Sequence, residues 1–367
     1  MSKVSAITER RLFSLLRMAL FEREEDLSIF KGMSDNDWKE IYSVALEQGV
    51  LAFAYDGATY LYEEIQPSIE IKIQWAYNIA YIEKIFAKQQ RTAQRFVKAL
   101  TPYEIKPVIL KGLSNASLFN NPAHRQAGDI DIHLMGDYAK GNKIAKSMGL
   151  KVRYDFFVHS EFKMNGINIE NHLFFVNPFV NATGKYVQDV LSAVSAESLL
   201  PHPIIDGAYM LPHEESALFL IRHSSWHYAR EGIKLRDICD WAMFLYKCGD
   251  TMDCTKVLKL LTESGLDRYA AIMTHIATQH LRLIPQLKFD TDYSDLAQRV
   301  KNDILSFCNP EKHSDIGFIR AFFLKMRNRI SRKWCYDDVV PDSYWGNIFY
   351  SIKGYLTNPS AIFKAKL

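Results

Sequence analysis

The pair Asn165-Gly166 constrains the fold more than any other feature of the sequence, because it separates two short runs of alternating polar and apolar residues. An Asn-Gly dipeptide in this setting is typical of a two-residue turn between antiparallel strands. The pattern predicts a hairpin with strands over Val158–Met164 and Ile167–Phe175. The turn also fixes the register, because a slip of one residue would move every side chain to the opposite face.

In the register set by this turn, Glu161 is expected to lie directly opposite Glu170, and His159 opposite His172. Like charges placed opposite each other destabilise a strand pair. The two glutamates therefore indicate a cation site, unless Lys163 neutralises them. The other face of the hairpin is predicted to pack on a core, since it carries Val158, Phe162, Met164, Ile167, Ile169 and Leu173.

A further strand is predicted over Asp129–Leu134, where polar and apolar residues again alternate. Asp129 and Asp131 are two residues apart, so both carboxylates project from one face of that strand. Carboxylates this close repel each other unless a cation lies between them, and Mg²⁺ (or Mn²⁺) prefers oxygen ligands. Two acidic residues on a strand are equally often just solvated. Glu170, or Glu161 in its place, supplies a third carboxylate and favours the metal site.

Upstream of these strands, the apolar run Pro107–Leu110 predicts a buried strand that enters a tight turn at Lys111-Gly112. Glycine allows close backbone approach, and the amides at a helix start, with the Ser114 hydroxyl, can donate to phosphate oxygens. An ordinary strand-to-helix turn has the same pattern. Arg125 lies four residues before Asp129, and its guanidinium suits phosphate, although an isolated arginine is more often a surface residue.

Helical periodicity surrounds this unit on both sides, which predicts an α+β fold: a small mixed β-sheet core between two helical regions. We expect an N-terminal helical region over residues 1–103, a core over 104–186 and a C-terminal helical domain over 187–367. The clearest helices are expected at Tyr138–Met148, Glu214–Arg230, Leu235–Lys247, Thr255–Glu263 and Tyr269–Arg282.

Composition excludes several classes of protein. Of the 367 residues 48% are hydrophobic, which is too many for a disordered chain, and the net charge of +3 does not by itself indicate a polyanionic partner. No apolar run is long enough to span a membrane, and no signal peptide is recognisable, so a cytoplasmic location is expected. The cysteines form no CxxC pair and are expected to be reduced thiols; they are Cys239, Cys248, Cys254, Cys308 and Cys335.

These residues together resemble a known family. The run VILKGLSNASLFNNPAHRQAGDIDIHL, followed by INIENHLFF, is similar to the polymerase-β-type nucleotidyltransferase superfamily. More narrowly, it resembles uncharacterised bacterial nucleotidyltransferases with a Leu-Lys-Gly … Arg … Gly-Asp-Ile-Asp pattern. The resemblance covers residues 104–180 and continues weakly over 218–245. One departure is Leu113, which separates the turn glycine from Ser114.

The resemblance implies metal-dependent transfer of a nucleoside monophosphate from a nucleoside triphosphate. Asp129, Asp131 and Glu170 would be the catalytic metal ligands. The nucleotide would be bound by Lys111, Gly112, Ser114, Arg125, His172, His227 and Arg236. The acceptor class stays open between a small molecule, RNA and a protein, as does the oligomeric state. Alternatives are a toxin-like enzyme that modifies tRNA or protein, and a catalytically silent nucleotide-binding or assembly module.

Two weaker signals lie in the C-terminal half. His223 and His227 are four residues apart on a predicted helix, so they share a face and, with Asp237 or Asp240, offer a second metal site. Packed histidines at a helix interface are the more common arrangement. Between Phe318 and Trp334 the chain is basic and aromatic without an acidic residue, which is typical of a solvated helix face or, less often, of a surface for nucleic acid or anionic membrane.

Overall fold

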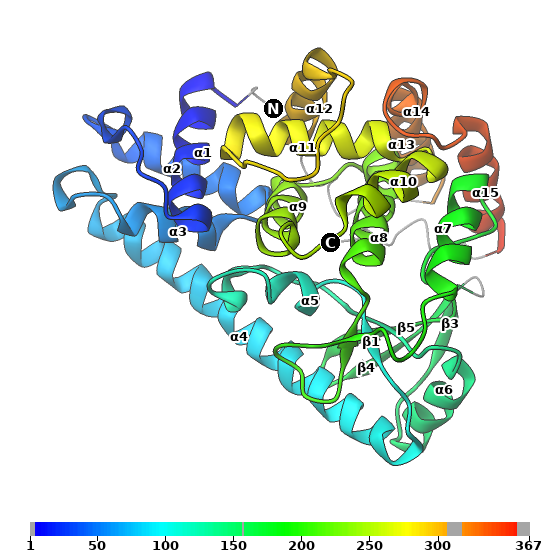
Figure 1. Cartoon of the computed structure of the whole chain (residues 1–367). Coiled ribbons are helices and arrows are strands. Elements are labelled where there is room, and N and C mark those ends of the chain that lie inside the picture. Colours follow the sequence, from blue (N-terminus) through cyan, green and yellow to red (C-terminus); the bar gives the residue numbers. More distant parts are fainter. Residues whose placement is uncertain (1–3, 156–157, 307–317, 358–367) are drawn as a thin grey trace.

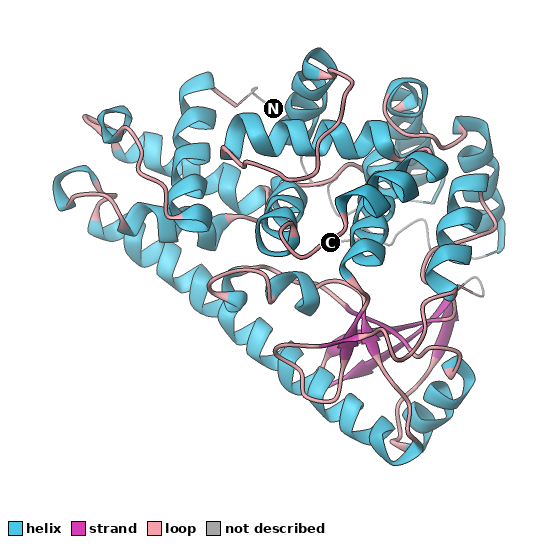
Figure 2. Cartoon of the chain, viewed as in Figure 1, coloured by secondary structure: helices cyan, strands magenta, loops and turns pink. Residues whose placement is uncertain are grey.

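The computed structural model describes residues 4–155, 158–306 and 318–357. One mixed sheet of seven strands forms a small layer at one end of the molecule, and helices make up most of the remainder (Figure 2). The expected α+β architecture is confirmed. Among the described helices, none combines the length and the apolar character needed to cross a membrane.

Four helices and three short 3-10 turns precede the sheet. The second helix begins where Ser34 and Asp37 cap each other's backbone, as a capping box does. The last of the four, α4, has 32 residues and ends before Pro102, which disfavours helical geometry in the residue before it. The helices are α1 (Ala6–Phe21), α2 (Asp35–Glu47), α3 (Leu51–Thr59) and α4 (Ile69–Leu100), with turns at Leu27–Phe30, Glu63–Ile65 and Thr101–Tyr103.

The sheet has the strand order β3-β4-β5-β2-β1-β7-β6. Strand β2 pairs parallel with β5 and antiparallel with β1, and β1 pairs parallel with β7. The last two strands follow residue 186, so the sheet uses more of the chain than the pattern predicted. The strands are β1 (Val108–Ile109), β2 (Ile130–His133), β3 (Arg153–Asp155), β4 (His159–Met164), β5 (Ile167–His172), β6 (Leu200–Pro201) and β7 (Tyr209–Met210).

The predicted hairpin and its register are confirmed in β4 and β5. Met164 pairs with Ile167, Glu161 with Glu170 and His159 with His172. Asn165 and Gly166 both have positive φ, at 51° and 72°, which is the geometry of a type I′ turn. Asn-Gly tolerates these angles better than other pairs, so the local sequence sets the register of the whole hairpin.

The two faces of the sheet differ. Phe96 and Leu100 of α4 belong to the same buried cluster as Ile132 and Phe162 of the sheet, so α4 covers the apolar face. Helix α6 (Tyr138–Ser147) packs there as well, through Ile144. The alternation of the strands then places the acidic side chains on the opposite face, toward the C-terminal helices.

The N-terminal and C-terminal helices share a second buried cluster. It includes Leu16 of α1, Trp75 of α4, Ile238 of α9 and Ile272 of α11, and Figure 1 shows α1–α3 beside α9 and α11. Helices from distant parts of the chain therefore bury one another. The remaining helices are α5 (Leu113–Ala116), α7 (Ala182–Ser192), α8 (His213–Glu231), α9 (Leu235–Cys248), α10 (Cys254–Ser264), α11 (Asp267–Leu281), α12 (Ser294–Ser306), α13 (Phe318–Ser331), α14 (Lys333–Asp338) and α15 (Tyr344–Thr357).

The basic segment between Phe318 and Trp334 is partly internal. Arg332 is buried and donates to the Tyr228 carbonyl and to Asp303, and Arg329 is buried as well. These two cations therefore do not belong to a solvated face, whereas Arg327 is exposed. Of the cysteines, Cys239, Cys248, Cys254 and Cys335 are free thiols, as expected, and Cys308 lies outside the described residues.

Candidate functional site

Two buried carboxylates lie side by side at the centre of the sheet. The parallel register of β2 and β5 pairs Asp131 with Glu170, and these residues are only 2% and 8% exposed. His172, two residues further along β5, places Nε2 3.1 Å from Asp131 Oδ1 and 3.5 Å from Glu170 Oε2. The three side chains offer donor atoms within 4.8 Å of one another, which is close enough to hold one metal ion.

A second group of possible metal ligands shares Glu170. His159 Nε2 lies 3.5 Å from Glu161 Oε1 and 3.9 Å from Glu170 Oε2. Arg153 on β3 donates to Glu161 at 3.1 Å, so this arginine offsets part of the negative charge. From the sequence, Lys163 was the residue that could neutralise Glu161 and Glu170. In the described part of the chain Lys163 forms no ion pair and is exposed.

Asp129 lies just before β2, at the rim of the same face. Of the described residues, it belongs to neither group of metal ligands. Partial burial of its carboxyl, and then the negative charges of Glu170 and Asp131, raise the pKa of Asp129 to about 6. Lys111 and the Asn168 side chain oppose this rise. Asp129 thus lies near enough to Glu170 and Asp131 for their charges to add to the effect of burial, although it lies further out.

Two cationic side chains lie against Asp131. Lys111 Nζ is 3.3 Å from Asp131 Oδ1 and 2.9 Å from His223 Nε2. Burial alone would lower the pKa of His172, but hydrogen bonds and charge from Asp131 and Glu170 raise it to about 9. Burial alone would raise the pKa of Asp131, but Lys111 and His172 hold it below its usual value. A protonated His172 and Lys111 thus balance the buried carboxylate.

The turn at Gly112 lies against the backbone of Asp129. Gly112 has φ of 66°, and a Cβ there would meet the Asp129 carbonyl oxygen at 3.4 Å. This conformation strains any residue with a side chain, which explains glycine at the turn. The Ser114 hydroxyl is buried and donates to the Ile109 carbonyl at 2.8 Å. It therefore stabilises the turn from inside, and its predicted contact with phosphate stays a prediction.

The loop before Asp129 is held by two helices, α4 and α9. Gln89 of α4 donates to the carbonyls of Ala127 (3.1 Å) and Gly128, and Arg236 of α9 donates to the Gln126 carbonyl at 3.1 Å. Arg125 is buried and pairs with Asp240 of α9, with Nε 3.0 Å from Oδ1. Asp240 also accepts a hydrogen bond from Asn115 of α5. The predicted phosphate ligands Arg125 and Arg236 thus make loop-anchoring contacts.

Helix α8 brings its histidines toward Lys111. The rings of His223 and His227 lie 4.5 Å apart, and His223 contacts the Lys111 ammonium. The alternative metal site with Asp237 or Asp240 does not form among the described residues, where the possible metal-ligand groups lie on the hairpin and β2. Asp240 is instead paired with Arg125.

Sequence reasoning missed Arg153 and Gln89, and it did not predict the contacts that Asp240 and His223 make at the site. Arg153 lies on a three-residue strand, too short to show a periodic pattern. The Asp240 and His223 contacts join residues more than a hundred positions apart, so no local signal predicts them. A signal did exist for Gln89, because it is a polar residue on the mostly apolar buried stripe of α4.

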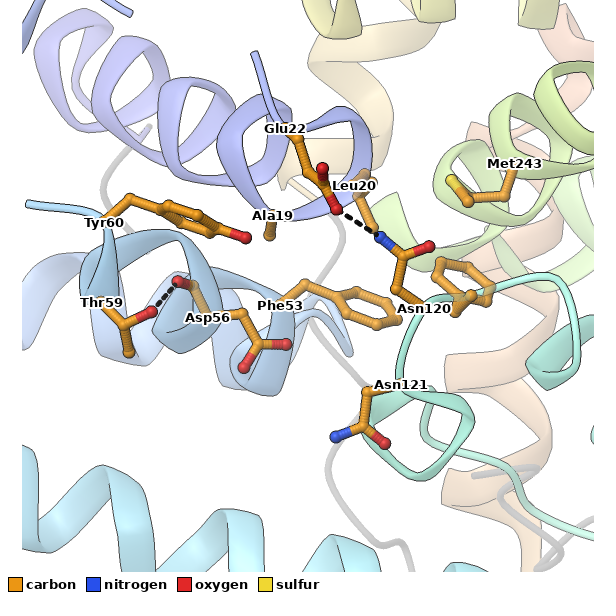
Figure 3. A pocket seen from close by; sticks show the side chains of 11 residues that line it. Ala19, Leu20, Glu22, Phe53, Asp56, Thr59, Tyr60, Asn120, Asn121 and Met243 are labelled. Carbon is orange, nitrogen blue, oxygen red and sulfur yellow. Dashed lines mark hydrogen bonds between the residues drawn. The ribbon is translucent and has the colours of Figure 1, made fainter. Parts of the chain in front are cut away.

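A pocket of about 280 Å³ lies away from these residues, between α1, α3 and the loop that follows α5 (Figure 3). Phe53, Asp56 and Asn120 line it, and Asn120 donates a hydrogen bond to Glu22 at 3.4 Å. None of the predicted site residues contributes to its wall. The pocket therefore gives no support to the predicted nucleotide contacts.

Comparison with known families returns one match. A family model described as an uncharacterised nucleotidyltransferase matches residues 34–282. This span reaches from α2 to α11 and includes the whole sheet, the Gly112 turn and both histidines of α8. Comparisons with curated proteins and with solved structures return no match.

Proposed function

Because this chain belongs to the uncharacterised nucleotidyltransferase family, we propose that it transfers a nucleoside monophosphate from a nucleoside triphosphate to an acceptor, using divalent ions held by Asp129, Asp131 and Glu170. The observation that carries this proposal is the parallel register that buries Asp131 beside Glu170. Buried carboxylates are normally paired or bound to metal, because an isolated buried charge is very unfavourable.

The donor chemistry fits such ions. The carboxylates of Asp131 and Glu170 accept either Mg²⁺ or Mn²⁺, and the imidazole of His172, which lies within reach of the same ion, would favour Mn²⁺. Burial first, and then the negative charges of Glu170 and Asp131, raise the pKa of Asp129, and a bound cation would relieve the second of these two causes. When bound, divalent ions would activate the acceptor hydroxyl and offset the charge of the triphosphate.

The protein's own groups take the remaining tasks. Asp129 lies at the rim of the carboxylate cluster, and this carboxylate or the neighbouring Glu170 would help to activate the acceptor hydroxyl. Lys111 can turn its ammonium from Asp131 to the triphosphate once a metal ion balances that carboxylate. Gly112 carries no side chain, so a phosphate oxygen could approach the backbone closely at this turn.

We assign positioning roles to the arginines of the predicted nucleotide site. Arg236 holds the Gln126 carbonyl, and Arg125 is locked to Asp240, so both fix the loop that carries Asp129. His227 supports His223, which in turn contacts Lys111. His172 balances Asp131 until a metal ion binds. A catalytically silent module would have no use for three carboxylates that repel one another.

Nucleotide-dependent thermal stabilisation tests this proposal. With Mn²⁺ and non-hydrolysable ATP or GTP analogues, the protein should gain about 2.7 kcal/mol at ligand concentrations near 100 Kd. Asp131→Asn should abolish the metal-dependent part of this gain. Asp189→Asn is the matched control, because Asp189 is exposed on α7 and, among the described residues, forms an ion pair with Lys185 alone. Equal stabilisation of the wild type and Asp131→Asn would contradict the proposal.

A further inference from the structure

One face of helix α4 is uncovered and carries large apolar side chains over its first half. Ile69, Ile73, Tyr77 and Tyr81 follow one another at intervals of four residues and are 64%, 63%, 78% and 63% exposed. Residues at this spacing lie in line along a helix. Single exposed hydrophobic residues are ordinary, but a continuous row of four marks a surface that meets a partner.

The same face becomes basic over the second half of the helix. Its cations recur at intervals of three or four residues, so they continue the line; they are Lys84, Lys88, Arg91, Arg95 and Lys98. Four of them are exposed and Lys88 is half-buried. None forms an ion pair with a described residue. The one acidic residue between 71 and 103 is Glu83, which lies against His124. We call the four exposed apolar residues, Ile69 to Tyr81, together with these five cations the α4 face.

The α4 face runs up to the rim of the candidate active site. Helix α4 extends along the outer edge of the molecule from the N-terminal helices to the sheet (Figure 1). Lys88 Nζ lies over the hairpin turn, 3.2 Å from the position that a Cβ of Gly166 would take. Two residues after that turn, Asn168 interacts with Asp129. The neighbouring Gln89 holds the loop before Asp129.

We propose that the α4 face binds an RNA acceptor, whose strand passes over the hairpin turn to reach the carboxylates. This inference rests on the proposed function and names its acceptor class. The five cations extend over about 21 Å, at 1.5 Å per residue, and neutralise successive phosphates. Tyr77 and Tyr81 offer flat surfaces on which unpaired bases stack, and stacking of this kind accompanies a basic track in proteins that bind single strands.

The distribution of residues favours RNA over an anionic membrane. A helix that lies in a membrane interface mixes apolar and basic residues along its whole length, so that every turn contributes to insertion. On the α4 face the two kinds are separated along the axis: the apolar half ends at Tyr81 and the basic half begins at Lys84. The basic half is also the half that approaches Asp129.

Binding of a fluorescein-labelled single-stranded RNA, followed by anisotropy between 50 and 200 mM salt, tests the proposal. The triple variant Lys84→Gln/Arg91→Gln/Arg95→Gln should bind about tenfold or more weakly at the lowest salt. Its slope of log K against log salt should fall by about 2, at roughly 0.7 per lost phosphate contact. The matched control is Lys143→Gln/Lys185→Gln/Lys259→Gln, which removes three exposed cations from α6, α7 and α10 and should bind as the wild type does.

A second variant separates stacking from charge. Tyr77→Ala/Tyr81→Ala removes two exposed rings, so folding should be unaffected, as circular dichroism can verify. We expect this variant to bind the RNA about tenfold more weakly with an unchanged salt slope, because stacking does not release counterions. An unchanged affinity would contradict the role of the tyrosines on the α4 face.

Three results would overturn the inference: no RNA binding by the wild type, equal weakening in the triple variant and its control, or binding to phosphatidylserine vesicles but not to RNA. Measurements of Mn²⁺ binding distinguish a failure of this inference from a failure of the proposed function. Asp131→Asn should lose Mn²⁺ but keep its RNA affinity. A wild type that binds Mn²⁺ and triphosphate but not RNA refutes this inference alone. One that binds RNA but not Mn²⁺ refutes the proposed function, and with it the role of the RNA as acceptor, but leaves the α4 face as an RNA-binding surface.

Discussion

Two buried charge clusters lie close to each other, and they differ in how their charges are paired. Arg125 and Asp240 are 6% and 7% exposed at their side chains and form a complementary pair, with Asn115 as a further donor. The cluster around Asp131 and Glu170 instead places two buried carboxylates side by side, with Lys111 and His172 as the cations against Asp131. The first arrangement is complete within the chain and holds the loop. The second sets carboxylates beside one another, and we propose that a divalent cation completes it.

The largest effect on stability is expected from breaking the complementary pair. Asp240→Ala would leave Arg125 charged, buried and unpaired, so the free energy of unfolding should fall by about 3–5 kcal/mol. Urea denaturation measures this loss. Asp189→Ala, in an exposed pair with Lys185, should change stability by only ~0–1 kcal/mol. If Asp240→Ala is as mild as its control, the pair does not anchor the loop.

His172 gives the like-charge cluster a pH dependence. Its pKa is about 9 in the folded protein against 6.5 in the unfolded chain, so its protonation stabilises the metal-free fold. This contribution is complete below pH 6.5 and disappears as the pH rises through 9, with a slope of up to about 1.4 kcal/mol per unit. Thermal unfolding in EDTA between pH 6.5 and 9 should show the decline in the wild type and lose it in His172→Gln. Identical profiles would remove His172 from this role.

Loss of the Asp129 charge should increase the stability of the metal-free protein but abolish its activity. Because the pKa of Asp129 is raised from 3.8 to about 6, the metal-free fold loses stability as the pH rises from 3.8 to 6 and does not regain it above. Asp129→Asn should therefore stabilise the metal-free protein at pH 7, by ~1 kcal/mol after discounting for solvent screening, while transfer activity disappears. A destabilised Asp129→Asn protein in EDTA would show that no repulsion is present.

The smallest effect is expected for the Ser114 hydroxyl. It donates inward to the Ile109 carbonyl, so Ser114→Ala should lower the free energy of unfolding by about 1 kcal/mol and leave nucleotide affinity nearly unchanged. Calorimetric titration with a triphosphate analogue checks this. A large loss of affinity would instead place the hydroxyl on the phosphates, as the family resemblance implies.

The parts of the fold that the sequence predicted are those with local causes. The Asn165-Gly166 turn and the alternation around it set the β4–β5 register, and Pro102 ends α4. Strands β3, β6 and β7 have two or three residues each, which is too short for a period to appear. The basic residues of α4 were not recognised as a surface either, because the net charge of +3 sums over the whole chain and acidic residues elsewhere offset them.

The candidate site was predictable in its residues but not in its contacts. Alternation put Asp129 and Asp131 on one face, yet their approach to Glu170 depends on the parallel pairing of β2 with β5, which no turn dictates. The Lys111–His223 contact and the Arg125–Asp240 pair join elements 112 and 115 positions apart. Such long-range pairs follow from packing of the helices on the sheet.

The most direct test of the central claim is a titration of the protein with Mn²⁺ that follows the free ion by electron paramagnetic resonance. The wild type should bind Mn²⁺ without nucleotide, and Asp131→Asn and Glu170→Gln should each lose this binding, while Asp189→Asn keeps it. Binding that survives in both carboxylate variants would contradict a metal centre at the junction of β2 and β5.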